Sequence, residues 1–159
     1  MNIEIERKFL VNDKFLKEIL PKKGIKIWQA YLVNQKNSSL RIRQKGETAY
    51  ITIKIGNNPL SRKEFEYEIP LTDLLEMKKE FKNCPSVEKI RYEYLYEGNL
   101  WEIDIFEGAN DGLILCEIEL SEKNIAFKKP EWIGEEVTHN TKYLNINLAS
   151  KPFKQWLKL

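Results

Sequence analysis

The sequence is poor in the residues that build soft-metal sites and nucleophilic triads. It contains one histidine, His139, and two cysteines, Cys84 and Cys116, in 159 residues. The cysteine spacing fits no zinc or redox motif, so we expect both thiols to be reduced and His139 to lie at the surface. A zinc site built on imidazoles is excluded, and so is a Ser-His-Asp triad unless His139 serves it. Any metal would be held by carboxylates, which favour Mg²⁺ or Mn²⁺.

The sequence also lacks a long apolar run. No stretch approaches the ~18–20 apolar residues that a membrane-spanning helix needs. The N-terminal residues carry Glu4 and Glu6 where a signal peptide would have a basic start followed by an apolar segment. We therefore predict a cytoplasmic protein that has no membrane partner.

Neither sign of charge dominates the chain. There are 26 Lys and Arg residues against 24 Asp and Glu residues, so the net charge is only +2. A nucleic-acid partner is disfavoured, because proteins that bind polyanions without sequence preference have a large basic surplus. The charged share of 31% nevertheless exceeds the ~25% of ordinary soluble domains. The information therefore lies in how these charges are arranged.

Apolar and polar residues alternate with a period of two through most of the chain, which is the pattern of a half-buried strand. Eight such segments are predicted as strands, over residues 3–11, 25–33, 40–44, 49–55, 62–69, 87–96, 100–106 and 113–120. Helices are predicted over residues 12–20, 72–82, 130–137 and, with an interruption at Pro152, 144–159. No repeat or low-complexity linker divides the chain, so residues 1–159 are predicted to form one domain.

Nearly every predicted strand has one ionic face and one apolar face. In an ordinary antiparallel sheet the ionic face would lie in water. However, eight strands suffice to close a barrel, which removes the sheet edges. The apolar faces carry large aromatic residues that need covering, namely Trp28, Phe65, Tyr67, Tyr92, Tyr94 and Trp101. We therefore predict an α+β fold: an eight-stranded antiparallel β-barrel that forms a tunnel lined by the ionic faces, with helices packed outside.

The two signs of charge are segregated by strand. The basic positions are Arg41, Arg43, Lys54, Lys89 and Arg91, and the acidic ones are Glu4, Glu6, Glu117 and Glu119. Desolvating an unpaired ion costs several kcal/mol, so such a tunnel would be filled with water and would need a charged ligand. Arginine forks match phosphate oxygens, and carboxylate pairs suit a hard divalent cation. The predicted ligand is therefore a metal–polyphosphate, and a linear triphosphate fits best.

Paired charged residues recur in a fixed order. The segment Glu4-Ile5-Glu6-Arg7-Lys8 is followed by Arg41-x-Arg43, Thr52-x-Lys54, Arg62-x-Glu64-x-Glu66, Lys89-x-Arg91, Glu102-x-Asp104 and Glu117-x-Glu119. A tail from Trp132 to Tyr143 completes the set. In this order of motifs, the chain resembles the triphosphate tunnel metalloenzymes, or CYTH superfamily, and most closely the short bacterial inorganic triphosphatases. The resemblance covers almost the whole chain.

The resemblance implies an eight-stranded tunnel that hydrolyses or cyclises triphosphates with Mg²⁺ or Mn²⁺. It implies catalytic roles for Lys8, Glu4 and Glu6. Phosphate binding would fall to Lys8, Arg41, Arg43, Lys54, Arg62, Lys89, Arg91 and Lys142. Metal binding would fall to Glu4, Glu6, Glu117 and Glu119, with Glu64, Glu66 and Asp104 holding a second metal, orienting the basic residues or positioning water. Salt bridges to the basic residues are the alternative for Glu102 and Asp104. Tyr31 would pack or bond to a neighbouring charge, or else act at Lys8.

The predicted reaction is hydrolysis of inorganic triphosphate to pyrophosphate and phosphate. A nucleoside or thiamine triphosphatase would need an added organic pocket, and a class IV adenylate cyclase would need a base site; we identify neither. An RNA 5′-triphosphatase is disfavoured because no basic outer pattern is present. A non-catalytic polyphosphate-binding module would lack the metal carboxylates. We expect a small polyanion as partner and a monomer or homodimer, with Phe153 and Trp156 packing on the barrel or at a dimer contact.

Overall fold

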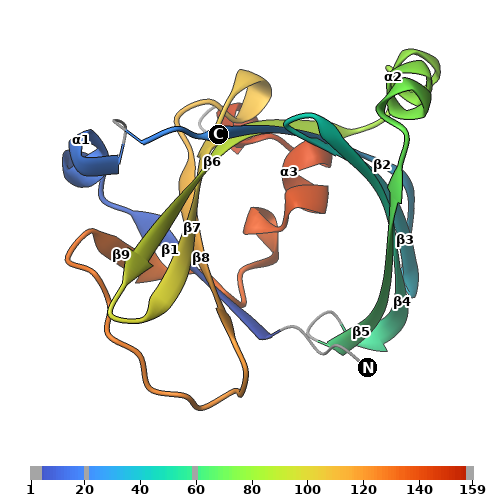
Figure 1. The fold of residues 1–159 in the computed structure, drawn as a ribbon. Coiled ribbons are helices and arrows are strands. Elements are labelled where there is room, and N and C mark those ends of the chain that lie inside the picture. The colour runs from blue at the N-terminus through green and yellow to red at the C-terminus, as the bar shows by residue number, and fades with distance from the viewer. Residues whose placement is uncertain (1–4, 20–21, 59–60, 157–159) are drawn as a thin grey trace.

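Nine antiparallel strands form one curved sheet in the computed structural model, which describes residues 5–19, 22–58 and 61–156 (Figure 1). The strands are β1 (Ile5–Val11), β2 (Ile25–Gln35), β3 (Ser38–Lys45), β4 (Thr48–Asn58), β5 (Ser61–Ile69), β6 (Ser86–Tyr96), β7 (Asn99–Phe106), β8 (Ile114–Leu120) and β9 (Ile133–Glu136). Their order across the sheet is β5-β4-β3-β2-β6-β7-β8-β1-β9. The curvature gives the sheet a concave and a convex face, and alternate residues of each strand point to each.

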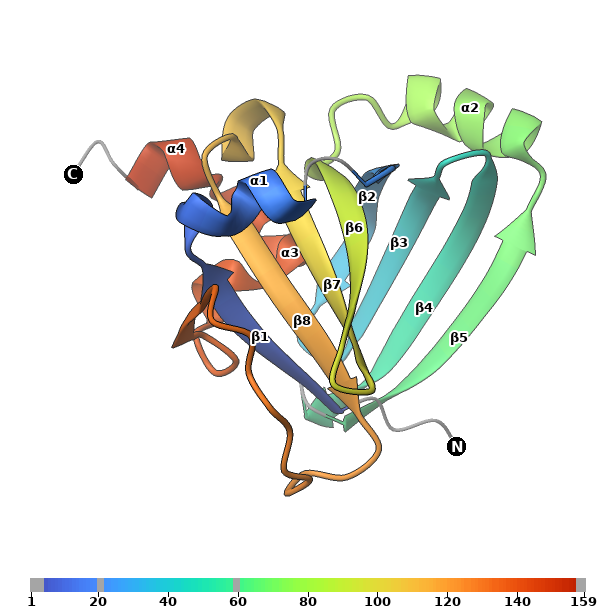
Figure 2. The ribbon, with the colours of Figure 1, turned by 60° about the vertical axis from the view of Figure 1, so that its left-hand side comes forward.

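Four short α-helices accompany the sheet. They are α1 (Leu16–Ile19), α2 (Leu71–Glu80), α3 (Asn145–Ser150) and α4 (Phe153–Trp156), and 3-10 turns occur at Asp13–Phe15, Gly108–Asn110 and Thr141–Tyr143. Helix α2 packs on the convex face against β3 and β4, whereas α3 lies within the curve of the sheet against β2 and β6 (Figures 1 and 2). No helix in the described ranges is long and apolar enough to span a membrane.

The eight predicted strands and the antiparallel fold are confirmed, with boundaries that differ by a few residues; residues 3 and 4 of the first predicted strand lie outside the described residues. One helix prediction is wrong: residues 130–137 contain β9, which pairs with β1 through Val11 and Ile133. This pairing brings the two backbones so close that a Cβ on Gly134 would lie 3.0 Å from the Leu10 carbonyl oxygen. A pairing partner far away in the sequence therefore overrides the local helical pattern.

Closure of the barrel is the second difference. Within the described residues, β5 and β9 are the two ends of the sheet, and no ladder of hydrogen bonds joins them. The predicted tunnel is therefore a strongly curved sheet that is not closed by hydrogen bonds. The concave face remains enclosed enough to hold a cavity, described below.

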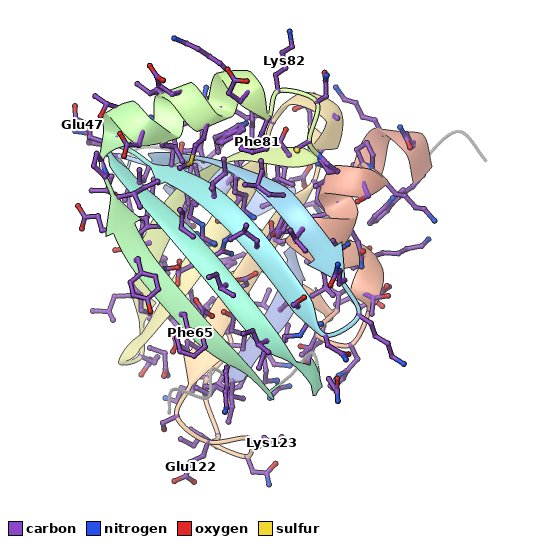
Figure 3. All side chains as sticks on the ribbon, turned by 90° about the vertical axis from the view of Figure 1, so that its right-hand side faces the viewer. Glu47, Phe65, Phe81, Lys82, Glu122 and Lys123 are labelled. Carbon is purple, nitrogen blue, oxygen red and sulfur yellow. The ribbon has the colours of Figure 1, made fainter. Side chains whose placement is uncertain are left out.

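The convex face is covered unevenly. Trp101 and Phe9 are fully buried beneath Phe127 and Trp132, which come from the segment between β8 and β9. The predicted covering of Phe65 is wrong, because this ring is 43% exposed on the convex face of β5 (Figure 3). Tyr67 on the same face is 59% exposed. Coverage fails there because α2 is only ten residues long and reaches only one end of β2 to β4.

The C-terminal segment packs against the rest of the same chain. Phe153 and Trp156 contact each other, with ring centroids 5.3 Å apart, and both lie against a buried cluster that includes Phe106 and Leu148. This packing is one of the two arrangements that the sequence allowed for these aromatic residues. It also fixes α3 in place, because Leu148 is the buried residue of that helix.

Leu74 is the residue through which α2 docks on the sheet. It is fully buried against Trp28, Ala30, Ile42 and Ala49, whereas its neighbour Leu75 is 42% exposed. We predict that Leu74→Ala lowers the free energy of unfolding by about 2–5 kcal/mol, because it leaves a cavity in the convex-side core. The matched variant Leu75→Ala should change it by about 0.5 kcal/mol or less. Urea unfolding followed by tryptophan fluorescence measures both, and equal effects would contradict this packing.

Candidate functional site

A cavity of about 380 Å³ opens on the concave face of the sheet. Its described lining contains seven cations, Lys8, Arg41, Arg43, Lys45, Lys54, Arg62 and Arg91. It also contains six carboxylates, Glu6, Glu64, Glu66, Glu102, Glu117 and Glu119. These residues come from seven strands and share one face because the side-chain period of a strand is two. The cavity is therefore densely charged and nearly balanced in sign.

Pairs of opposite charge lie side by side on adjacent strands of the β3–β5 wall. Lys54 on β4 faces Glu64 on β5, and Lys54 Nζ lies 3.1 Å from Glu64 Oε2. Two residues away along β4 and β5, a second cross-strand group is formed. There, Arg41 Nη2 donates to Thr52 Oγ1 at 3.1 Å and lies 3.4 Å from Glu66 Oε2. Thr52 Oγ1 in turn donates to Glu66 Oε2 at 2.8 Å. The cross-strand register thus holds both basic side chains in fixed positions.

Two guanidinium nitrogens at this wall have buried hydrogens that nothing accepts. Within the described part of the chain, Arg41 Nε and Arg62 Nε are buried and make no hydrogen bond. A buried donor without a partner costs about 1–3 kcal/mol. Both residues line the cavity, so an anion bound there would supply the missing acceptors. This observation points to phosphate oxygens as ligands.

Behind the cavity, Asp104 holds two buried cations. Its Oδ2 lies 2.6 Å from Lys89 Nζ, and its Oδ1 lies 2.7 Å from Arg91 Nε. Lys89 is fully buried and Asp104 is 1% exposed. Although burial alone would raise it, the pKa of Asp104 lies well below its usual value because Lys89 and Arg91 stabilise the carboxylate. Arg91 also pairs with Glu102, so its guanidinium links the buried pair to the cavity wall.

Lys8 reaches the opposite side of the cavity in a charged state. Its Nζ lies 3.1 Å from Glu117 Oε1 and donates to the carbonyl oxygen of Tyr143 at 3.1 Å. Burial works against the charge, but the Glu117 carboxylate more than compensates, and Glu6 and Asp104 add to it, so the pKa of Lys8 is raised. Lys8 is therefore a fixed ammonium group at the cavity surface.

Two carboxylates on neighbouring strands face each other at the cavity. Glu6 on β1 stands directly opposite Glu119 on β8, and both are exposed and line the cavity. Like charges directly opposite each other destabilise a sheet, and a shared hard cation would reverse that effect. This donor chemistry fits a divalent metal. The third predicted ligand, Glu4, lies outside the described residues, and within them no group of three acidic, histidine or cysteine side chains could hold a metal.

The structure brings most of the predicted site residues together. Those that line the cavity are Glu6, Lys8, Arg41, Arg43, Lys54, Arg62, Glu64, Glu66, Arg91, Glu117 and Glu119. Lys89 and Asp104 instead form the buried pair behind it. Lys142 is exposed, with its Nζ 5.1 Å from the centroid of the Trp156 ring.

The C-terminal segment and one buried amide contribute to the site in ways that the sequence did not predict. Leu144, Asn145 and Ile146 close part of the cavity, and Asn145 Oδ1 accepts a hydrogen bond from Lys89 Nζ at 3.2 Å. No local pattern marks these residues as neighbours of the strands. Gln29 is fully buried in β2 and bonds to both Arg43 and Tyr31. A lone amide within an otherwise apolar stretch of strand was the signal that would have found it.

Comparison with known proteins agrees with this geometry. The family model of the CYTH domain matches residues 2–152. An inorganic triphosphatase from Acetivibrio thermocellus is 42% identical over 156 residues, which are 98% of this chain and 99% of that protein. The crystal structure of the inorganic triphosphatase NE1496 matches with a TM-score of 0.68 at 35% identity, covering 94% of this chain and 95% of that one. A putative adenylate cyclase from Bacillus halodurans matches with a TM-score of 0.57 at 17% identity, covering 76% and 82% of the two chains, which shows a shared fold alone.

Asp104 offers a direct test of the buried charge cluster. We predict that Asp104→Asn lowers the free energy of unfolding by about 3–5 kcal/mol, because it leaves Lys89 and Arg91 buried without their carboxylate. The control Asp111→Asn removes an exposed carboxylate, 3.5 Å from Lys154, and should cost about 1 kcal/mol or less. Chemical unfolding at neutral pH measures both.

The acid limb of stability checks the same cluster. Because the pKa of Asp104 is lower in the folded chain than in the unfolded one, its contribution is fully present above about pH 4 and is lost as the pH falls through the folded value. Asp104→Asn should therefore flatten the loss of stability between about pH 4 and pH 2, where that contribution is titrated away. An unchanged acid limb would contradict the assignment.

Proposed function

Because the chain belongs to the CYTH domain family, we propose that it is a metal-dependent inorganic triphosphatase, which hydrolyses triphosphate to pyrophosphate and phosphate. The observation that carries this proposal is the cavity wall on which Arg41 and Arg62 present buried donors without acceptors. The names of its relatives, together with the high identity and nearly complete coverage, support the same reaction.

The basic residues bind and orient the substrate. Arg41, Arg43, Arg62 and Lys54 present donors from one wall, and Lys8 and Arg91 present donors from the other. Three linked phosphates between these walls would accept hydrogen bonds along their length. The transition state of phosphoryl transfer spreads negative charge over the phosphate oxygens, so fixed cations stabilise it more than they stabilise the substrate. Lys89 and Asp104 act indirectly, since they hold Arg91 in position.

The carboxylates on β1 and β8 would hold a divalent cation. The proposed ligands are Glu6 and Glu119, which lie within the described residues, and Glu4, which does not; Mg²⁺ or Mn²⁺ would suit this oxygen donor set. When bound, such an ion neutralises phosphate oxygens and lowers the pKa of a coordinated water. Glu117 forms an ion pair with Lys8, and this pair keeps the lysine beside the proposed metal ligands. Glu64 and Glu66 keep Lys54 and Arg41 in place on the opposite wall.

Hydrolysis transfers one phosphoryl group to water. The water oxygen bonds to a terminal phosphorus and gives up a proton to the solvent, while the bridging P–O bond breaks and its electron pair leaves with pyrophosphate. The ammonium of Lys8 is placed to stabilise the charge on the leaving oxygen or to orient the attacking water. Its raised pKa keeps it charged above neutral pH, which suits either of these roles.

Inorganic triphosphate is favoured over a nucleotide by the lining of the cavity. Among the described lining residues, the only apolar side-chain groups of any size are those of Leu144 and Ile146 and the ring of Tyr31. A base or thiazole ring would need a larger apolar slot, since organic ligands bind in mostly apolar pockets. We keep a class IV cyclase and a nucleoside or thiamine triphosphatase as alternatives that the assay below separates. We also propose a cytoplasmic location, no nucleic-acid partner, and a monomer or homodimer.

The proposed function is tested by phosphate release with Mg²⁺ or Mn²⁺. Inorganic triphosphate, ATP and thiamine triphosphate are compared in parallel, and we predict metal-dependent release chiefly from inorganic triphosphate. Glu119→Gln should lower kcat by about 100-fold or more, because it removes a carboxylate proposed to hold the metal at the developing charge. Glu76→Gln, which removes an exposed carboxylate on α2, should leave kcat unchanged.

Two results would contradict the proposal. Release of cyclic AMP and pyrophosphate from ATP, without release from inorganic triphosphate, would identify a cyclase. Tight binding of triphosphate without release from any substrate would identify a polyphosphate-binding module.

A further inference from the structure

We propose that Gln29 sets the direction of the Tyr31 hydroxyl, so that this hydroxyl donates a hydrogen bond to a phosphate oxygen in the cavity. Tyr31 lines the cavity, and Gln29 is fully buried beside it on the same strand, β2. Gln29 is then a positioning residue and Tyr31 a substrate-binding residue. This inference rests on the proposed function, because the acceptor is the bound polyphosphate.

The orientation of the Gln29 amide is fixed by Arg43. Arg43 Nε lies 3.0 Å from Gln29 Oε1. A guanidinium nitrogen can only donate, so the atom of Gln29 that faces it has to be the carbonyl oxygen. The amide nitrogen of Gln29 is consequently forced to the other side, toward Tyr31.

The amide nitrogen in turn fixes the role of the Tyr31 oxygen. Gln29 Nε2 lies 3.0 Å from Tyr31 Oη, and an amide nitrogen can only donate. The phenolic oxygen is therefore the acceptor in this bond, and its own hydrogen has to point elsewhere. Because Tyr31 borders the cavity, that hydrogen is available to a ligand oxygen. The tyrosine adds a neutral donor between the cationic ones.

The neutrality of Gln29 matters as much as its geometry. Arg43 donates to this neutral amide and lies near two further cations, Arg41 and Arg91. Burial, with repulsion from those cations, lowers the pKa of Arg43 to about 10. A pKa of about 10 still lies well above neutral pH, so Arg43 keeps a positive charge that a phosphate can meet. A carboxylate at position 29 would compensate that charge. It would also accept a hydrogen bond from the Tyr31 hydroxyl, and this bond would turn the hydroxyl away from the cavity.

The test is a double-mutant cycle of Gln29→Glu and Tyr31→Phe. The probe is imidotriphosphate with Mg²⁺, whose P–N–P bridges resist hydrolysis, and its affinity is measured by calorimetry. Tyr31→Phe should weaken binding about tenfold or more, since a hydrogen bond to a charged group is lost. Gln29→Glu should weaken it further still, because it removes the same bond and also compensates Arg43. Once Tyr31 is replaced, Gln29→Glu has no hydroxyl to redirect, so the double variant should bind as weakly as Gln29→Glu alone.

Matched variants separate this role from a structural one. Gln35→Glu makes the same charge change on an exposed residue of β2 and should leave affinity and thermal stability unchanged. Gln29→Met removes both hydrogen bonds without taking the Tyr31 proton, so the same cycle with Gln29→Met should show coupling of the same sign but smaller size. This second cycle keeps the test decisive if Gln29→Glu does not fold.

The possible results divide cleanly. Coupling between positions 29 and 31 supports the inference. Additive losses, with normal binding by the unsubstituted protein, overturn the role of Gln29 and leave the proposed function standing. Coupled binding without phosphate release from triphosphate overturns the hydrolase but supports the inference. No binding of imidotriphosphate with Mg²⁺ by the unsubstituted protein overturns both.

Discussion

Inside the sheet, the carboxylate of Asp104 accepts hydrogen bonds from Lys89 at 2.6 Å and from Arg91 at 2.7 Å, and hardly any of this cluster is reached by water. A buried ion costs several kcal/mol unless it is paired, so removal of any member leaves a charge that nothing compensates. The cluster anchors Arg91, which reaches the cavity, and Asn145, which positions α3 at the cavity edge. The charge pattern of the site and the packing of the C-terminal segment therefore depend on one another.

The same need for compensation explains what the cavity selects. Most of its described cations lie beside carboxylates, so a polyanion alone would meet repulsion as well as attraction. A divalent cation alone would be attracted by the carboxylates and repelled by the basic residues. A metal–polyphosphate satisfies both sets at once, because the carboxylates on β1 and β8 meet the metal and the guanidinium groups of Arg41 and Arg62 meet the phosphates. The net charge of +2 for the whole chain fits such a divided cavity.

Period-two alternation predicted the strands and the shared ionic face, because the direction of a side chain depends only on its place in the strand. The alternation does not predict how deeply a side chain on that face is buried. Lys89 and Arg91 occupy equivalent positions in the pattern, yet only Arg91 lines the cavity. β9 escaped prediction because its structure is imposed by β1, a partner more than 120 residues away. The exposure of Phe65 was not predictable from the sequence either, because the covering of that ring depends on where the short helix α2 ends. Gln29 acquires its meaning only from Arg43 and Tyr31, which strand pairing brings to its two sides.

Calorimetric titration of imidotriphosphate in the presence and absence of Mg²⁺ tests the central claim most directly. If the cavity is built for a metal–polyphosphate, Mg²⁺ and the polyphosphate should each strengthen the binding of the other. By thermodynamic linkage the factor is the same in both directions, and we expect it to be at least about tenfold. Glu119→Gln should abolish the coupling while polyphosphate binding without metal persists. Equal affinity for the polyphosphate with and without Mg²⁺ would contradict the account, since the carboxylates of β1 and β8 would then have no part in ligand binding.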